Sequence, residues 1–285
     1  MIEKIKNKAK ELLKNKQIEV FLGYKLSSDG RSVSPAFICN EEEADALIWD
    51  TRCAYNLSTY FKELADKKVG IVAKGCDIKS IIVLLQENQI KRENVFIVAV
   101  ECQGMIQEGT SLLSEKCGNC KVSTPEFYDI LISADSGKEK KPAGKEADEY
   151  KGVIDLESKS AEEKLKLWRQ EFSSCIRCYA CRQVCPMCYC RTCVAEQTMP
   201  VWVSKASDFE GNFSWHITRA MHLAGRCIDC GECERACPVG IPIRSINKKI
   251  EKDILELFKY QAGAKVDQKP LLSGFDKNDP ADFIK

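Results

Sequence analysis

Apolar runs alternate with amphipathic stretches in the first part of the chain. Three runs bounded by turn-forming or charged residues predict β-strands, at 18–24, 69–74 and 95–100. Four stretches carry helical patterns, at 3–16, 42–48, 52–66 and 77–90. Strands separated by helices of this length predict a mostly parallel sheet with crossover connections. The fully apolar runs fit a sheet that is covered on both faces.

The pattern changes after residue 132. The segment 133–160 is charged, has few large apolar residues and contains Pro142, which predicts a linker. Ser160 and Glu163 have the spacing of a capping box, so a helix is expected to start there. Further helical patterns lie at about 214–225 and 243–260, and the tail from 261 shows little periodicity.

Composition narrows the class of protein. With 285 residues, the chain is long enough for two domains. Its formal charge of +1 gives no field that would attract nucleic acid or an anionic membrane surface. The longest apolar run, at 81–85, falls far short of the roughly 20 residues that span a bilayer. The lysine-rich start of the chain does not resemble a signal peptide, so we expect a cytoplasmic protein without membrane or nucleic-acid partners.

Cysteine is strongly over-represented. The chain has 17 cysteines, an odd number that cannot all pair as disulfides. Disulfide-dense scaffolds are usually much shorter and secreted. The thiols are therefore expected to be reduced and to bind metal, in an organism that keeps oxygen away.

Two cysteine runs repeat the spacing C-x2-C-x2-C-x3-C followed by proline. The first is Cys175, Cys178, Cys181 and Cys185, and the second is Cys227, Cys230, Cys233 and Cys237. In two-cluster ferredoxins the first three thiolates of such a run bind one [4Fe–4S] cubane, and the fourth crosses to the other. This rule assigns one cluster to Cys175, Cys178, Cys181 and Cys237, and the other to Cys227, Cys230, Cys233 and Cys185. Zinc sites with four cysteines use paired C-x2-C knuckles instead, so this spacing favours iron.

The remaining cysteines suggest further sites. Cys188, Cys190 and Cys193 follow the first run closely and are interpreted as ligands of a further cluster, with buried free thiols as the alternative. Four N-terminal cysteines are the second group: Cys76, Cys102, Cys117 and Cys120. Two of these follow predicted parallel strands, at the sheet edge where α/β proteins bind ligands. The second group predicts either a cluster or a zinc site.

Other chemistry finds little support. No dinucleotide fingerprint, phosphate loop or nucleophile–base pattern is found, so no catalytic residue is assigned. His216 and His222 are expected to be packing residues or neighbours of a cluster, because the cysteines fill every ligand position. Cys39 and Cys53 are expected to be plain buried cysteines.

The stretch 67–105 resembles a known family. The turn KGCD with Cys76, and the next strand running into Cys102, are similar to the N-terminal domain of the beta subunits of deazaflavin-reducing hydrogenases and formate dehydrogenases. The two cysteine runs resemble the dicluster segment of electron-transfer subunits of the heterodisulfide reductase type. That beta-subunit family carries FAD and uses a further C-terminal domain, and this chain has a linker and a dicluster module in its place.

The expected architecture has four parts. These are an α/β domain at 1–132, a charged linker at 133–160, a mainly helical [4Fe–4S] dicluster ferredoxin-like domain at 161–260 and an extended tail at 261–285. Two [4Fe–4S] clusters are expected, with one or two more from the other cysteine groups.

Two functions are compatible with these features. The first is an electron-transfer subunit that links a formate dehydrogenase or hydrogenase to a flavoprotein of the heterodisulfide reductase type. The alternative is a flavin-containing oxidoreductase subunit that accepts hydride from a deazaflavin or a nicotinamide cofactor. FAD is expected only in the alternative.

Overall fold

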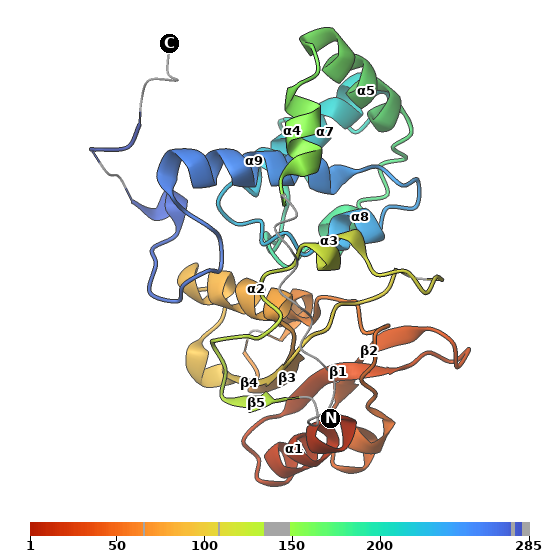
Figure 1. The fold of residues 1–285 in the computed structure, drawn as a ribbon, viewed down its shortest axis with the longest axis vertical. Helices are drawn as coiled ribbons and strands as arrows, with labels where there is room; N and C mark the ends of the chain where they lie inside the picture. The colour runs from red at the N-terminus through yellow and green to blue at the C-terminus, as the bar shows by residue number, and fades with distance from the viewer. Residues whose placement is uncertain (65, 108, 134–148, 275–276, 281–285) are drawn as a thin grey trace. The chain divides into compact units, whose positions relative to one another are not determined.

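The computed structural model of the chain describes residues 1–64, 66–107, 109–133, 149–274 and 277–280 (Figure 1). The chain forms two compact units. Unit 1 consists of Met1–Ala147 with Gly263–Gln268, and unit 2 consists of Asp148–Ala262 with Lys269–Lys285. The last segment of unit 1, Gly263–Gln268, therefore follows the main part of unit 2 in the sequence.

Unit 1 is built on a five-stranded sheet with the order β2-β1-β3-β4-β5. The strands are β1 (Val20–Leu26), β2 (Val33–Ile38), β3 (Val69–Ala73), β4 (Val95–Val100) and β5 (Ile130–Ile132). β1, β3, β4 and β5 are parallel, and β2 runs antiparallel to β1, which confirms the predicted mostly parallel sheet. The apolar pattern misses β2 and β5, because Ser34 and Pro35 interrupt the first and the second has three residues. Pro35 is tolerated because β2 lies at the sheet edge.

Helices lie on both sides of this sheet (Figure 1). The helical elements of unit 1 are α1 (Ile2–Lys14), η1 (Glu42–Ala46), η2 (Leu57–Glu63), α2 (Gly75–Gln86), η3 (Arg92–Asn94) and α3 (Glu115–Gly118). Every residue of β3 is buried, as expected for a strand covered on both faces. The helical predictions at 42–48 and 52–66 correspond to short 3₁₀ helices, η1 and η2.

The segment Gly263–Gln268 packs against α2. The Nε2 atom of Gln86 donates to the carbonyl oxygens of Lys265 at 2.7 Å and Gln268 at 2.6 Å. Gly263 has a φ of +68°, and a Cβ atom there would lie 2.4 Å from the carbonyl oxygen of Lys79. Only glycine fits this close approach.

Unit 2 is helical, as predicted. Its elements are α4 (Lys151–Glu157), α5 (Ala161–Ser173), α6 (Ala180–Gln183), η4 (Val194–Glu196), α7 (Phe209–His222), α8 (Glu232–Arg235), α9 (Ile243–Phe258) and η5 (Leu271–Ser273). The capping box predicted at Ser160 and Glu163 starts α5, with Glu163 N–H to Ser160 Oγ at 3.2 Å. None of the helices in the described residues is both long and apolar enough to span a bilayer.

One part of the predicted linker differs from the expectation. Residues 134–148 lie outside the described residues, but Lys151–Glu157 forms α4. Glu157 on α4 pairs with Lys249 at 2.8 Å and with Lys252 at 3.1 Å, both on α9. These ion pairs attach α4 to unit 2, and the composition of the segment does not reveal them.

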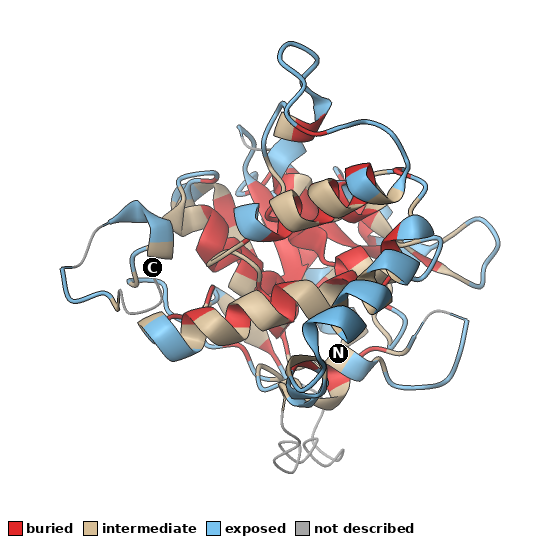
Figure 2. Cartoon of the chain, turned by 90° about the horizontal axis from the view of Figure 1, so that it is seen from above, coloured by how far each residue is buried: buried red, intermediate tan, exposed pale blue. Residues whose placement is uncertain are grey.

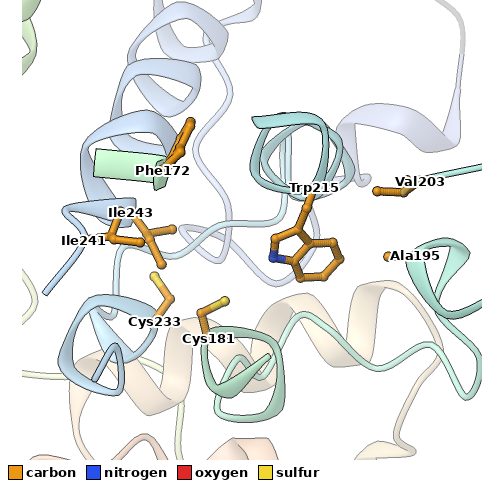
Figure 3. Close-up of a cluster of buried hydrophobic side chains, with 8 residues drawn as sticks. All are labelled: Phe172, Cys181, Ala195, Val203, Trp215, Cys233, Ile241 and Ile243. Atoms are coloured by element: carbon orange, nitrogen blue, oxygen red, sulfur yellow. The ribbon is translucent and has the colours of Figure 1, made fainter. Parts of the chain in front are cut away.

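The core of unit 2 surrounds two of the predicted ligands. The buried residues of this core are Phe172, Cys181, Ala195, Val203, Trp215, Cys233, Ile241 and Ile243 (Figure 3). In Figure 3, Trp215 lies beside Cys181, and Ile243 lies beside Cys233. Buried positions follow the inner sides of strands and helices, and the surrounding loops are exposed (Figure 2). The cysteine loops are thus anchored in an apolar core.

Candidate iron–sulfur sites

The two cysteine runs fold in the same way. In each run the residue before the second cysteine has positive φ: Arg177 at 56° and Asp229 at 55°. The residue after the second cysteine does so as well: Tyr179 at 59° and Gly231 at 72°. A one-turn helix then follows, α6 in the first run and α8 in the second. Left-handed residues alternating with right-handed ones turn successive backbone N–H groups toward one point, which favours an anion there.

The first cavity has a volume of about 320 Å³, part of which is open to solvent. Its cysteines are Cys175, Cys178, Cys181 and Cys237. Three of these thiols come from the first run and one is the last cysteine of the second run. Trp215 and His216 of α7 also line this cavity.

The second cavity has a volume of about 370 Å³, part of which is open to solvent. Its cysteines are Cys227, Cys230, Cys233 and Cys185. Here three thiols come from the second run and one is the last cysteine of the first run. The eight cysteines therefore line the two cavities in two groups of four, and their roles as cluster ligands stay a prediction.

Backbone N–H groups point at the thiols of both runs. The amide of Arg177 donates to Cys175, and the amide of Asp229 donates to Cys227, at the matching position of the second run. Ile241 donates to the Sγ atom of Cys237 at 3.3 Å. Hydrogen bonds of this kind stabilise a sulfur atom that carries negative charge.

Burial governs the acidity of these thiols. Desolvation raises the pKa of Cys181 and Cys227, and it raises the pKa of Cys233 to about 12. Thiols buried in this way ionise only when a cation compensates the thiolate charge. Iron supplies this compensation, so four convergent cysteines with aligned amides are a donor set that fits a [4Fe–4S] cubane.

Cys188, Cys190 and Cys193 lie in three different environments. Cys188 hydrogen-bonds the thiol of Cys185, which lowers the pKa of Cys185 and raises that of Cys188. Cys190 is exposed, and Cys193 packs against the apolar core of unit 2. In the described part of the chain, no three Cys, His, Asp or Glu side chains are grouped as they are around a single metal ion. A further cluster on these three cysteines stays a prediction.

The N-terminal cysteines lie in one region of unit 1. Cys76 is the second residue of α2, shortly after β3, and Cys102 follows β4, so both lie after strand ends as expected from the sequence. Burial raises the pKa of Cys76 to about 12 and also raises that of Cys102. Cys102 interacts electrostatically with Cys76, and also with Cys117 and Cys120.

Backbone amides also reach this group. The N–H of Gly104 donates to the Sγ atom of Cys102 at 3.4 Å, and the N–H of Met105 donates to that of Cys117 at 3.4 Å. The remaining N-terminal cysteines differ from each other. Cys53 is buried as expected, whereas Cys39 is exposed. The four-cysteine group therefore has the donors and amide hydrogen bonds that suit a metal centre.

Two charged side chains at the second cavity, Asp229 and Arg219, are not assigned to a site from the sequence. Asp229 lies inside a C-x2-C spacer, but its partners are on α9: Arg244 at 2.6 Å and Lys248 at 3.1 Å. These pairs lower the pKa of Asp229 against the effect of its burial. Arg219 of α7 lines the second cavity and is buried. The position of Asp229 within a C-x2-C spacer could have identified it as a residue at the cavity. Nothing in the sequence identifies Arg219 as such a residue.

Comparison with known proteins agrees with this geometry. Residues 174–242 match the model of a 4Fe-4S dicluster domain. The chain is also similar to two curated proteins. One is the F420-dependent formate dehydrogenase subunit beta of Methanocaldococcus jannaschii, 25% identical over 93% of this chain and 92% of that protein. The other is the F420-dependent formate dehydrogenase 1 subunit beta of Methanococcus maripaludis, 24% identical over 93% of this chain and 91% of that protein. The comparisons confirm the expected resemblance to formate dehydrogenase beta subunits and the expected 4Fe-4S dicluster domain in the C-terminal part.

Proposed function

We propose that this chain is the iron–sulfur electron-transfer subunit of a multi-subunit redox complex. In this role it relays single electrons between a catalytic subunit of the formate dehydrogenase or hydrogenase type and a flavoprotein of the heterodisulfide reductase type. The observation that carries the proposal is the pair of cavities lined by four cysteines each. All four positions of each cubane are filled by thiols, so no iron is left open for a substrate.

The crosswise lining supports the assignment of ligands. One cluster is assigned to Cys175, Cys178, Cys181 and Cys237, and the other to Cys227, Cys230, Cys233 and Cys185. Each cysteine run contributes to both clusters, so the two centres lie close to one another. When bound, the clusters supply one-electron redox chemistry. The protein contributes thiolates, aligned amides and an apolar shell that keeps water away.

A third cluster in unit 1 is part of the proposal. Cys76, Cys102, Cys117 and Cys120 interact electrostatically, and two amides donate to their sulfur atoms. Zinc is the alternative occupant of four cysteines. Metal analysis separates the two occupants, because it measures iron and zinc independently. A zinc site would also give no reducible centre in unit 1.

The alternative function is a flavin-containing subunit that accepts hydride from a deazaflavin or a nicotinamide cofactor. The names of the two similar proteins, which describe F420-dependent enzymes, favour it. Bound FAD would convert hydride into single electrons for the clusters. The relay and the hydride acceptor differ in one measurable respect, because only the second needs a flavin.

The test is the metal and flavin content of anaerobically purified full-length protein, followed by reduction. About twelve irons per chain without flavin or zinc would support the relay with three clusters, and about eight irons with one zinc would support two clusters and a zinc site. If the protein is a relay, its chemically reduced form should pass electrons to a one-electron dye. Its oxidised form should not be reduced by NADH or by a reduced deazaflavin. Stoichiometric flavin together with reduction by either hydride donor would overturn the relay in favour of the alternative.

A further inference from the structure

Arg219 is a buried cation between the cysteine runs. It lies on α7, its side chain lines the second cavity, and the residue is 4% exposed. Its Nη2 atom donates to the carbonyl oxygen of Cys181 at 3.0 Å. Its Nε atom is buried and has no hydrogen-bond partner. The side chain is thus held in place but only partly satisfied by the protein.

Two other arginines of unit 2 pair with carboxylates: Arg182, which is buried, with Glu196, and Arg244, which is half-buried, with Asp229 at 2.6 Å. Arg177, which is buried and lines the first cavity, donates to the carbonyl oxygens of Gly211 and Ser204, both at 2.7 Å. For Arg219, the described residues provide no Asp or Glu within ion-pair distance. An uncompensated buried charge is costly, so a counter-charge is expected nearby.

The groups that face Arg219 are thiols of both cavities and the thiol of Cys188, to which its side chain donates a hydrogen bond. Burial raises the pKa of Cys181 in the first cavity and of Cys233 in the second, and the positive charge of Arg219 opposes both shifts. The same charge contributes to the lowered pKa of Cys185 in the second cavity, after the hydrogen bond from Cys188. Four-thiolate cubanes carry net negative charge, and each accepted electron increases it.

We propose that Arg219 is the shared counter-ion of both clusters, a positioning residue whose fixed positive charge raises both reduction potentials. The inference rests on the two clusters of the proposed function. The effect should be larger for the cluster in the second cavity. Arg219 lines that cavity and does not line the first, where its hydrogen bond reaches only the backbone carbonyl oxygen of Cys181.

The test compares Arg219→Gln, Arg219→Lys and Arg182→Gln in the anaerobic full-length protein. Arg182 is a matched control, because it lies between Cys181 and Cys185 in the sequence but pairs with Glu196 and lines neither cavity. Reduction midpoints are measured by redox titration with electron paramagnetic resonance. Cys178→Ser and Cys230→Ser assign each midpoint to its cavity.

We expect Arg219→Gln to lower both midpoints, the one of the second cavity more, whereas Arg219→Lys stays close to wild type and Arg182→Gln shifts neither cluster comparably. Unchanged midpoints in an iron-loaded Arg219→Gln, or equal shifts in Arg182→Gln, would overturn the inference. If Arg219→Gln does not retain iron, Arg219→Lys decides: midpoints at wild-type values support the counter-ion, and midpoints that fall refute it. A wild-type protein without two unit 2 midpoints would overturn the proposed function as well.

Discussion

The Nε2 atom of His216 lies 3.4 Å from the Sγ atom of Cys175. The imidazole stacks on Phe172 with ring centroids 4.5 Å apart, and its Nδ1 atom is buried without a hydrogen-bond partner. Burial lowers the pKa of His216 to about 4, with the charges of Arg219 and Arg177 acting in the same direction. A neutral imidazole whose Nδ1 is unpartnered best satisfies its surroundings when Nε2–H donates to the sulfur atom.

His216→Phe should therefore lower the midpoint of the cluster in the first cavity. Phenylalanine keeps the stacking on Phe172 but removes the donor to Cys175, and a hydrogen bond to a cluster thiolate raises the potential. The exchangeable proton coupled to this cluster should also disappear from its pulsed magnetic resonance spectrum. His222, exposed on the same helix, provides the control variant His222→Phe. Identical midpoints and proton couplings in both variants would show that the contact has no role.

Cys237→Ser should remove the cluster of the first cavity, although Cys237 belongs to the second run. Iron counting in double variants shows which cluster is lost. With Cys178→Ser added, the loss should remain about four irons, because both changes affect one cluster. With Cys230→Ser added, the loss should rise to about eight. The reverse pattern would mean that each run holds its own cluster. Cys39→Ser, an exposed thiol, serves as the control.

Asp229→Asn should raise the midpoint of the cluster in the second cavity. The change removes a negative charge beside Cys227, and with it the carboxylate that Arg244 and Lys248 pair with there, while Lys248 keeps its pair with Glu251 at 3.0 Å. Asparagine tolerates the positive φ of this position, so the backbone of the loop should persist. Glu256→Gln on the same helix as Arg244 is the control, because Glu256 pairs with Lys252 at the surface. A midpoint that falls, or that moves equally in the control, would contradict the prediction.

Gly75→Ala should disrupt the N-terminal metal centre and leave unit 2 loaded. A Cβ atom at Gly75 would lie 1.9 Å from the carbonyl oxygen of Val122, so the segment that carries Cys120 must move. The expected loss is about four irons per chain if the centre is a cluster. Gly118→Ala, beside Cys117, is the matched control because nothing lies within 4 Å of its added Cβ. Full metal content in Gly75→Ala would contradict the prediction.

Lys74→Met should destabilise unit 1 strongly. The ammonium of Lys74 lies 2.9 Å from the carboxylate of Asp77 and 2.8 Å from the carbonyl oxygen of Tyr55. The side chains of Lys74 and Asp77 are both buried. Removing one partner of a buried pair costs about 3–5 kcal/mol, because the other charge stays uncompensated. Amide hydrogen exchange in β3 and α2 should accelerate by about two orders of magnitude or more. Lys10→Met, which breaks an exposed pair with Asp45, should leave exchange in these elements unchanged.

The sequence predicts the parallel core of unit 1 and the two groups of four cysteines, since apolar runs and ligand spacing are local signals. It misses the edge strand β2, where a proline interrupts the apolar pattern. It also misses α4, whose attachment depends on ion pairs with Lys249 and Lys252, about 95 residues further along the chain. His216 is expected from the sequence as a packing residue or a neighbour of a cluster, and the structure places it against Phe172 and Cys175. The position of Arg219 beside the cysteines depends on how α7 packs, and periodicity along one helix carries no information about that contact.

The position of Gly263–Gln268 in unit 1 has a consequence for the order of synthesis. All eight cysteines of the two runs leave the ribosome before the segment that packs on α2 does. A chain that ends before residue 263 would therefore carry every cysteine of both runs but would lack the segment whose carbonyl oxygens accept from Gln86 on α2.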